Sequence, residues 1–371
     1  MSSVNSSIET ISEKYVLNLN IKLLDNQNRE ISRFNKTINE EGYIVRKDND
    51  IDIKKKQSEI NRNEIFLFRN KILNNNIIKI DNFVSKKNNF QKIELVDYLD
   101  NKLWFILNPE NKEEKEKTHY SLYESDIIKL GTIKFIVHEI NIISDNSDPN
   151  MTINNETNDY NEINKNSEEI FYQIPEIENY KRCKFCDTYN VCLCDPKKEH
   201  ILHYSCLKDK VKKELKTPEN KNKNIKSYII ENFKCVHCLS QYPIRFRLGN
   251  KNSNLIYDLI PIERPMKSDY IILESFGDMN KKSIYLIILK EKIIKIGRNE
   301  KNDLILNDSS IGDEHAVIKF DKNNKKVILE SVNNNYETSV LVKKNIIMNE
   351  KVITLQVGNL KFEANLKKIN N

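Results

Sequence analysis

Short apolar segments separated by polar turns dominate the chain from about residue 64 onward. Segments of four to eight residues that are rich in Ile, Phe and Val and bounded by Asn, Lys and Asp predict β-strands. The same texture returns after about residue 258 and continues to about residue 364. We therefore expect a mainly β protein, α+β overall. The clearest predicted strands of the first half are 65–69, 77–80, 103–107 and 126–140.

Two stretches lack this texture. Residues 1–60 are polar and weakly periodic, and we expect a partly disordered N-terminal segment there. Residues 144–170 contain almost nothing that could pack and predict a disordered linker. The remaining chain then divides into three expected domains, which are a β-rich block at 61–143, a cysteine-containing module at 178–248 and a second β-rich domain at 256–368.

One internal repeat connects the two β-rich blocks. The segment Leu130-Gly-Thr-Ile-Lys-Phe135 matches Val357-Gly-Asn-Leu-Lys-Phe362 in pattern, and each lies at the end of its block. Two related β-sandwiches on either side of the cysteine module would explain the match. Chance similarity between two strand-turn-strand segments explains it nearly as well.

All seven cysteines lie between Cys183 and Cys238. An odd number argues against a framework made only of disulfides, and such a cluster in a reducing compartment is typical of metal binding. Pairs of ligands two residues apart suit a tight turn that aims both side chains at one ion, and thiolate and imidazole are the ligands that zinc prefers. The predicted ligands for two zinc ions are Cys183, Cys186, Cys192, Cys194, His203, Cys206, Cys235 and Cys238.

This ligand order resembles the RING-CH (RING-variant) family of ubiquitin ligases. The resemblance implies a cross-braced module, in which one ion is held by Cys183, Cys186, His203 and Cys206 and the other by Cys192, Cys194, Cys235 and Cys238. It also implies a ubiquitin-conjugating enzyme as partner. The short spacing from Cys186 to Cys192, the long stretch from Leu207 to Lys234 and the absence of a tryptophan after Cys206 depart from the family pattern.

Three smaller features belong to this module. His203 pairs with Cys206 at the family spacing, whereas His200 and His237 are better interpreted as surface histidines. Apolar residues at Leu207, Val211 and Leu215 form one stripe of a short amphipathic helix.

A second family resemblance begins at Ile296. The run from Ile296-Gly-Arg298 through Asn302-Asp303 to His315-Ala-Val-Ile318 resembles a forkhead-associated (FHA) domain, a β-sandwich whose loops bind phosphothreonine peptides. Gly297 permits a tight turn, and the forked guanidinium of Arg298 suits a phosphate. In the family, the residue at His315 braces the loop. Apolar side chains at Leu304, Leu306, Ala316 and Ile318 supply core positions.

The loops of this domain depart from the family pattern. The usual serine and arginine before the histidine are Gly312 and Asp313, and the usual Asn-Gly-Thr turn is Tyr336-Glu-Thr338. Glycine offers no hydroxyl to a phosphate, and an aspartate repels it. Of the phosphopeptide contacts that the resemblance implies, Arg298 is the main one that remains, and Ser309 and Ser310 would substitute for the others only if the loop shifts; Gly297 and His315 are structural. The fold class expected is one or two FHA-like sandwiches with a small two-zinc module between them.

Composition excludes several classes of protein. With seven glycines there is no Gly-rich phosphate loop, and no catalytic residues are predicted. The net charge of +6 is too mild to favour nucleic acid, although the Lys-rich stretch 208–226 keeps that alternative open. No apolar run is long enough to span a bilayer, and the start lacks the pattern of a signal peptide. An intracellular, soluble protein of the cytoplasm or nucleus is expected, without a membrane partner.

Two functions remain open. A RING-type ubiquitin ligase would recruit a conjugating enzyme through the zinc module and phosphorylated proteins through the FHA domain. A non-enzymatic, zinc-dependent scaffold with a degenerate phosphopeptide site would bind proteins without ubiquitin transfer. The combination of a cysteine module and an FHA domain, over roughly residues 120–366, resembles multi-domain proteins of ciliates.

Overall fold

The computed structural model describes residues 14–24, 29–38, 42–47, 50–54, 65–73, 77–81, 102–108, 118–143, 173–174, 204–234, 241–242, 244–248, 256–278, 280–291, 293–333, 335–343, 345–348 and 352–369. Within them the chain is mainly β, with antiparallel sheets consistent with an FHA-like β-sandwich, as the sequence predicts. No helix among these residues is long and apolar enough to cross a membrane.

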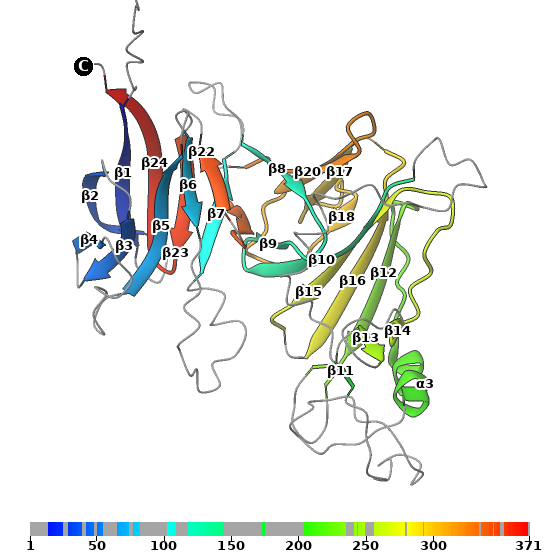
Figure 1. Ribbon diagram of the computed structural model, residues 1–371. Helices are drawn as coiled ribbons and strands as arrows, with labels where there is room; N and C mark the ends of the chain where they lie inside the picture. The colour runs from blue at the N-terminus through cyan, green and yellow to red at the C-terminus, as the bar shows by residue number, and fades with distance from the viewer. Residues whose placement is uncertain are drawn as a thin grey trace, which may run out of the picture. The chain divides into compact units, whose positions relative to one another are not determined.

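The chain divides into two compact units, and the division does not follow the sequence in order. Unit 1 consists of Met1–Asn111 together with Ser339–Asn371, and unit 2 consists of Lys112–Thr338. The expected blocks 61–143 and 256–368 are therefore each divided between the units. The cause is strand pairing, because the C-terminal strands pair with strands near the N-terminus. Figure 1 shows the dark blue and red strands of unit 1 side by side.

Unit 1 contains two groups of neighbouring strands. The first has the order β2 (Glu30–Ile38), β1 (Lys14–Leu24), β24 (Leu360–Ile369), β23 (Val352–Val357) and β7 (Leu103–Leu107). The second has the order β4 (Asp50–Lys54), β3 (Gly42–Lys47), β5 (Ile65–Leu73), β6 (Ile77–Asp81) and β22 (Asn345–Met348).

Strands form within residues 1–60, the segment that the sequence predicts to be polar and partly disordered. In β1, Leu17, Leu19 and Ile21 are buried at every second position. The intervening polar side chains are only half-buried. This period of two is that of a strand with one face on a core. The same alternation is present in the sequence from Leu17 to Lys22, within a segment whose overall composition is polar. In the core of unit 1, these three side chains of β1 pack with residues of β23 and β24, among them Leu355 and Phe362.

Unit 2 repeats this arrangement with other strands. One group has the order β12 (Ile225–Glu231), β16 (Lys281–Ile288), β15 (Tyr270–Phe276), β10 (Ile133–Asn141) and β9 (Ile127–Leu130). The other has the order β18 (Leu304–Ile305), β17 (Ile293–Gly297), β19 (Ala316–Asp321), β20 (Lys326–Ser331) and β8 (His119–Leu122). A small sheet contains β11 (Gln173–Ile174), β13 (Arg245–Leu248) and β14 (Ile256–Asp258), and β21 (Thr338–Leu341) spans the boundary of the units.

The strands predicted in the first half of the chain are confirmed. The segments at 65–69, 77–80 and 103–107 correspond to β5, β6 and β7, and 126–140 forms the β9–β10 hairpin. The predicted core positions Leu304, Leu306, Ala316 and Ile318 are buried.

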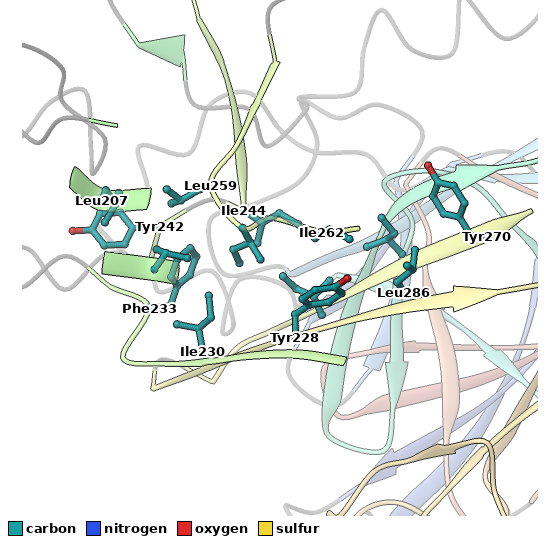
Figure 2. Close-up of a cluster of buried hydrophobic side chains, with 14 residues drawn as sticks. Leu207, Tyr228, Ile230, Phe233, Tyr242, Ile244, Leu259, Ile262, Tyr270 and Leu286 are labelled. Carbon is teal, nitrogen blue, oxygen red and sulfur yellow. The ribbon is translucent and has the colours of Figure 1, made fainter. Parts of the chain in front are cut away.

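The helix α3 (Tyr204–Glu214) and strand β12 belong to unit 2. The predicted amphipathic stripe is confirmed, since Leu207 and Val211 are buried and Leu215 packs beside them. Figure 2 shows Leu207 next to Tyr242 and Phe233, in a cluster that continues through Tyr228 to Leu286 of the sheet. Because β12 pairs along its whole length with β16, the described part of the expected 178–248 module is joined to the β-sandwich of unit 2.

Candidate functional site

Arg298 directly follows β17, and its backbone ties it to the loop that precedes β19. Its N–H donates to the carbonyl of Gly312 at 2.8 Å. Its guanidinium contacts one carboxylate oxygen of Asp313, at 3.1 Å from Nη2 and 3.3 Å from Nε. Both side chains are exposed, 43% for Arg298 and 68% for Asp313. An ion pair this exposed contributes only about 0–1 kcal/mol, so the guanidinium remains available to a stronger anion.

Gly297 lies at a close approach between the loop that follows β17 and the loop that precedes β19. A Cβ at this position would lie 2.2 Å from the carbonyl oxygen of Asp313 and 2.7 Å from Nδ2 of Asn302. That amide nitrogen belongs to a buried side chain and donates to the carbonyls of Asn299 and Asp313, at 2.8 and 2.6 Å. Asn302 therefore holds the two loops together, and any side chain at Gly297 would separate them.

His315 is fully buried beneath these loops. Its Nδ1 accepts the N–H of Gly312 at 3.2 Å, so the proton of the neutral ring lies on Nε2, which donates to the carbonyl of Glu337 at 3.2 Å. Burial lowers the pKa of His315, against a smaller opposing effect of the bond to Glu337. The neutral imidazole thus connects the Gly312 loop to the Glu337 loop.

Ser310 has its hydroxyl fully committed. Its Oγ donates to Asp308 Oδ1 at 2.6 Å, and its N–H donates to the same oxygen at 2.8 Å. The Oγ also accepts the N–H of Thr132 at 2.9 Å and lies 2.9 Å from the Thr132 hydroxyl, which must be the donor because the serine proton is already used. Ser309, by contrast, has an exposed side chain.

Tyr336 accounts for the glycine at position 312. A Cβ on Gly312 would lie 2.6 Å from Cδ2 of the Tyr336 ring. The same ring lies 6.0 Å from the imidazole of His315, measured between centroids and tilted by 47°. The glycine at 312 and the tyrosine at 336, which both depart from the FHA pattern, therefore pack against each other.

Sequence reasoning missed the contribution of the β9–β10 hairpin to these loops. Gly131 N–H donates to the carbonyl of Glu337 at 2.9 Å, and Lys129 Nζ pairs with the Glu337 carboxylate at 3.0 Å. The internal repeat at 130–135 marked this hairpin, but a local pattern does not identify a partner about two hundred residues away. The loops near Arg298 thus combine residues from both ends of unit 2.

The predicted zinc ligands fall almost entirely outside the described residues. Cys206 is described and lies half-buried on α3. Cys183, Cys186, Cys192, Cys194, His203, Cys235 and Cys238 lie outside the described residues. Among the residues that are described, no group of three or more His, Cys, Asp or Glu side chains could hold a metal ion.

Comparison with known families agrees with the geometry of these loops. Residues 294–360 match the FHA domain family, so the chain contains an FHA domain. Searches of curated proteins and of solved structures gave no match. The matched range begins in β17 and ends at the start of β24, so it includes residues of both units.

Proposed function

We propose that the loops around Arg298 bind phosphothreonine peptides and that the protein mediates interactions with phosphorylated partners. An FHA domain suggests this class of function. The observation that carries the proposal is the exposed guanidinium of Arg298, whose backbone N–H is bonded to the Gly312 carbonyl and whose ion pair with Asp313 is itself exposed.

A phosphate competes well for this guanidinium. Asp313 offers one oxygen to Arg298, whereas a phosphate monoester carries about −1.5 to −2 charges at neutral pH and three acceptor oxygens. Forked, charge-assisted bonds between arginine and phosphate are roughly twice as strong as neutral ones. Asp313 then acts as a weak internal competitor, which the phosphate displaces from Arg298. Ser309, on the neighbouring loop, has an exposed hydroxyl that a ligand can reach.

Fluorescence anisotropy with a degenerate phosphothreonine peptide library and its unphosphorylated counterpart tests the proposal on the full chain. Wild-type protein should bind only the phosphorylated library, and Arg298→Ala should lose most of that binding. Arg33→Ala is the matched control, because Arg33 is also an exposed arginine, 50% accessible and paired with Glu30 at 2.7 Å. Equal binding of the two libraries, or equal loss in the two variants, would rule the function out.

Removal of the Asp313 charge should raise the affinity for phosphopeptide, whereas removal of Arg298 should lower it. Asp313→Asn keeps the shape of the side chain and removes its charge. Since the exposed pair contributes about 0–1 kcal/mol, affinity for the phosphorylated library should rise by up to about fivefold. The gain should disappear in the Arg298→Ala background.

We further propose that the cysteine segment binds two zinc ions and serves as a second interaction module. Two described features fit this donor set. Cys206 lies half-buried on a helix that is fixed in the core by Leu207 and Val211. Lys234 and Gln241 form an antiparallel bridge, and Tyr242 N–H donates to the carbonyl of Phe233 at 3.2 Å. The described residues on either side of Cys235 and Cys238 in the sequence are therefore antiparallel neighbours.

Zinc content per chain, measured by mass spectrometry of the purified protein, tests this second proposal. Two equivalents are expected, and Cys206→Ser should lower the content, whereas Ser205→Ala on the same helix should not. An autoubiquitination assay of the same samples with a panel of conjugating enzymes distinguishes a ubiquitin ligase from a non-enzymatic scaffold. Ubiquitin transfer would support a ligase, and zinc binding without transfer would support the scaffold. Absence of zinc in freshly purified protein would contradict both.

A further inference from the structure

Two hairpins of this chain occupy the same place in their respective units. In the β9–β10 hairpin, Leu130 pairs with Ile133 around Gly131 and Thr132. In the β23–β24 hairpin, Val357 pairs with Leu360 around Gly358 and Asn359. Both glycines have a left-handed φ, 57° and 55°. Such two-residue turns require a positive φ that glycine adopts without strain.

The strands that receive the two hairpins are also equivalent. In unit 1, β24 pairs with β1, and the strand before the hairpin, β22, pairs with β6. In unit 2, β10 pairs with β15, and the strand before the hairpin, β8, pairs with β20. Figure 1 shows β10 beside β15 and β24 beside β1. Residues 119–141 therefore complete unit 2 as residues 345–369 complete unit 1.

This arrangement changes which hairpin lies at the Arg298 loops. The FHA match ends at residue 360 and so includes Gly358 and Asn359. Asn359 contacts Leu24 in unit 1, whose N–H donates to the Asn359 carbonyl at 2.9 Å and whose carbonyl accepts from Asn359 Nδ2 at 3.2 Å. At Ser310 the hairpin tip is instead Thr132, which comes from outside the matched range.

We propose that Thr132 is a positioning residue of the phosphopeptide site, supplied by the segment 119–141; this inference rests on the function proposed above. Thr132 donates its N–H and its hydroxyl to Ser310 Oγ, and the Ser310 hydroxyl donates a hydrogen bond to Asp308 Oδ1. The adjacent Gly131 N–H shares the Glu337 carbonyl with His315. The hairpin tip thus holds both the Ser309–Ser310 loop and the Glu337 loop, which His315 connects to Gly312 and so to the backbone of Arg298.

Close packing at Gly131 supports this role. A Cβ there would lie 2.3 Å from the carbonyl oxygen of Ser310 and 2.5 Å from its Oγ. The tip is therefore seated against the backbone of the Ser310 loop, and a small displacement of the hairpin would move that loop.

The binding test uses Thr132→Val, which removes the hydroxyl and keeps the branched shape, and Thr132→Ser, which restores the hydroxyl. Loss of one hydrogen bond should weaken binding of the phosphothreonine library by about threefold to tenfold, and the serine variant should restore it. Asn359→Ala is the matched control at the equivalent hairpin position and should leave affinity unchanged. Melting temperatures of all variants separate positioning from loss of fold, since Thr132→Val should melt within a few degrees of wild type.

A second measurement tests the placement without any peptide. In the double variant Thr132→Cys, Ser310→Cys, oxidised glutathione should join the two new cysteines, and mass spectrometry of proteolytic fragments identifies the pair among the native cysteines. The control Asn359→Cys, Ser310→Cys should not form a cross-link.

The outcomes separate the inference from the function on which it rests. If wild-type protein binds neither peptide library, the proposed function fails and the positioning role fails with it, while the cross-link still reports where the hairpin lies. If wild type binds and Thr132→Val binds equally well, the positioning role is overturned and the function stands. A cross-link from residue 359 instead of residue 132 overturns the placement.

Discussion

Gly312 lies directly against the ring of Tyr336, so close that a Cβ on the glycine would lie 2.6 Å from the ring carbon Cδ2. The serine that FHA domains usually have at this position cannot be introduced while the tyrosine stays in place. The two sequence departures therefore depend on each other, and a double-mutant cycle can measure their coupling.

The first prediction concerns this pair. Gly312→Ser alone should destabilise unit 2 by about 1–3 kcal/mol, the usual cost of overpacking. Tyr336→Asn combined with Gly312→Ser should recover most of that loss and should bind the phosphothreonine library more tightly than wild type, because the new hydroxyl can donate to phosphate. Urea unfolding and anisotropy check the two effects, and strict additivity of the single changes would contradict the coupling.

The second prediction concerns the buried ion pair between Glu274 on β15 and Lys282 on β16. Lys282 Nζ lies 2.6 Å from Glu274 Oε1, and His138 Nδ1 lies 3.4 Å from Oε2. Lys282→Met leaves the carboxylate without its main partner and should cost about 3–5 kcal/mol in unfolding free energy. Lys216→Met is the control, because its pair with Glu231 is about 60% exposed and should contribute at most about 1 kcal/mol.

The same pair predicts an acid-dependent loss of stability. Burial disfavours the charged form of Glu274, but the charge of Lys282 and the bonds from His138 and Lys282 lower its pKa from 4.5 to about 2. A carboxyl group with a lowered native pKa stabilises the fold fully above the unfolded pKa, and this contribution is lost as the pH falls from 4.5 toward 2. Urea unfolding between pH 6 and pH 2.5 should show a weaker dependence in Glu274→Gln than in wild type.

The third prediction concerns His315. Because burial lowers its pKa below the unfolded value of 6.5, the unfolded chain binds the proton more readily than the native fold. Its contribution to stability is therefore complete above pH 6.5 and declines as the pH falls below that value. His315→Gln should flatten the unfolding free energy between pH 7.5 and pH 5.

The fourth prediction concerns the junction between α3 and the β-sandwich. Leu207→Ala removes a side chain that is 1% exposed and packs with Phe233 and Tyr242, so it should destabilise unit 2 by about 2–5 kcal/mol. Leu215→Ala, at the half-buried end of the same stripe, should cost less. A single thermal transition that shifts for the whole of unit 2 is expected. A separate early transition of the helix alone would show that the junction is weak.

Local sequence was sufficient for several features. The stripe of Leu207 and Val211 predicted α3, and the apolar segments predicted β5, β6, β7 and the β9–β10 hairpin. The signature at Gly297 and Arg298 predicted the FHA domain that the family match shows. These features depend on periodicity or on short-range backbone requirements, which neighbouring residues determine.

The distribution of strands between the units could not be read in the same way. The alternation of Leu17, Leu19 and Ile21 with polar residues is short and lies in a segment of polar overall composition, and the N-terminal strands were missed. The partner of Ser310 was missed as well, because Thr132 precedes it by 178 residues. Hydrogen bonds between strands use backbone atoms common to all residues, so a strand's sequence specifies its buried face more strongly than its partner.

The sequence by itself determined that this chain forms two similar glycine-turned hairpins and a loop with an arginine suited to phosphate. Only the tertiary structure decided that the hairpin at Gly131 completes the unit containing Arg298, while the hairpin at Gly358 completes the unit that begins at β1. The reason is physical. Leu130 and Phe135 are buried at the positions of their hairpin that correspond to Val357 and Phe362. Which hairpin joins which unit therefore depends on side-chain packing across the whole core.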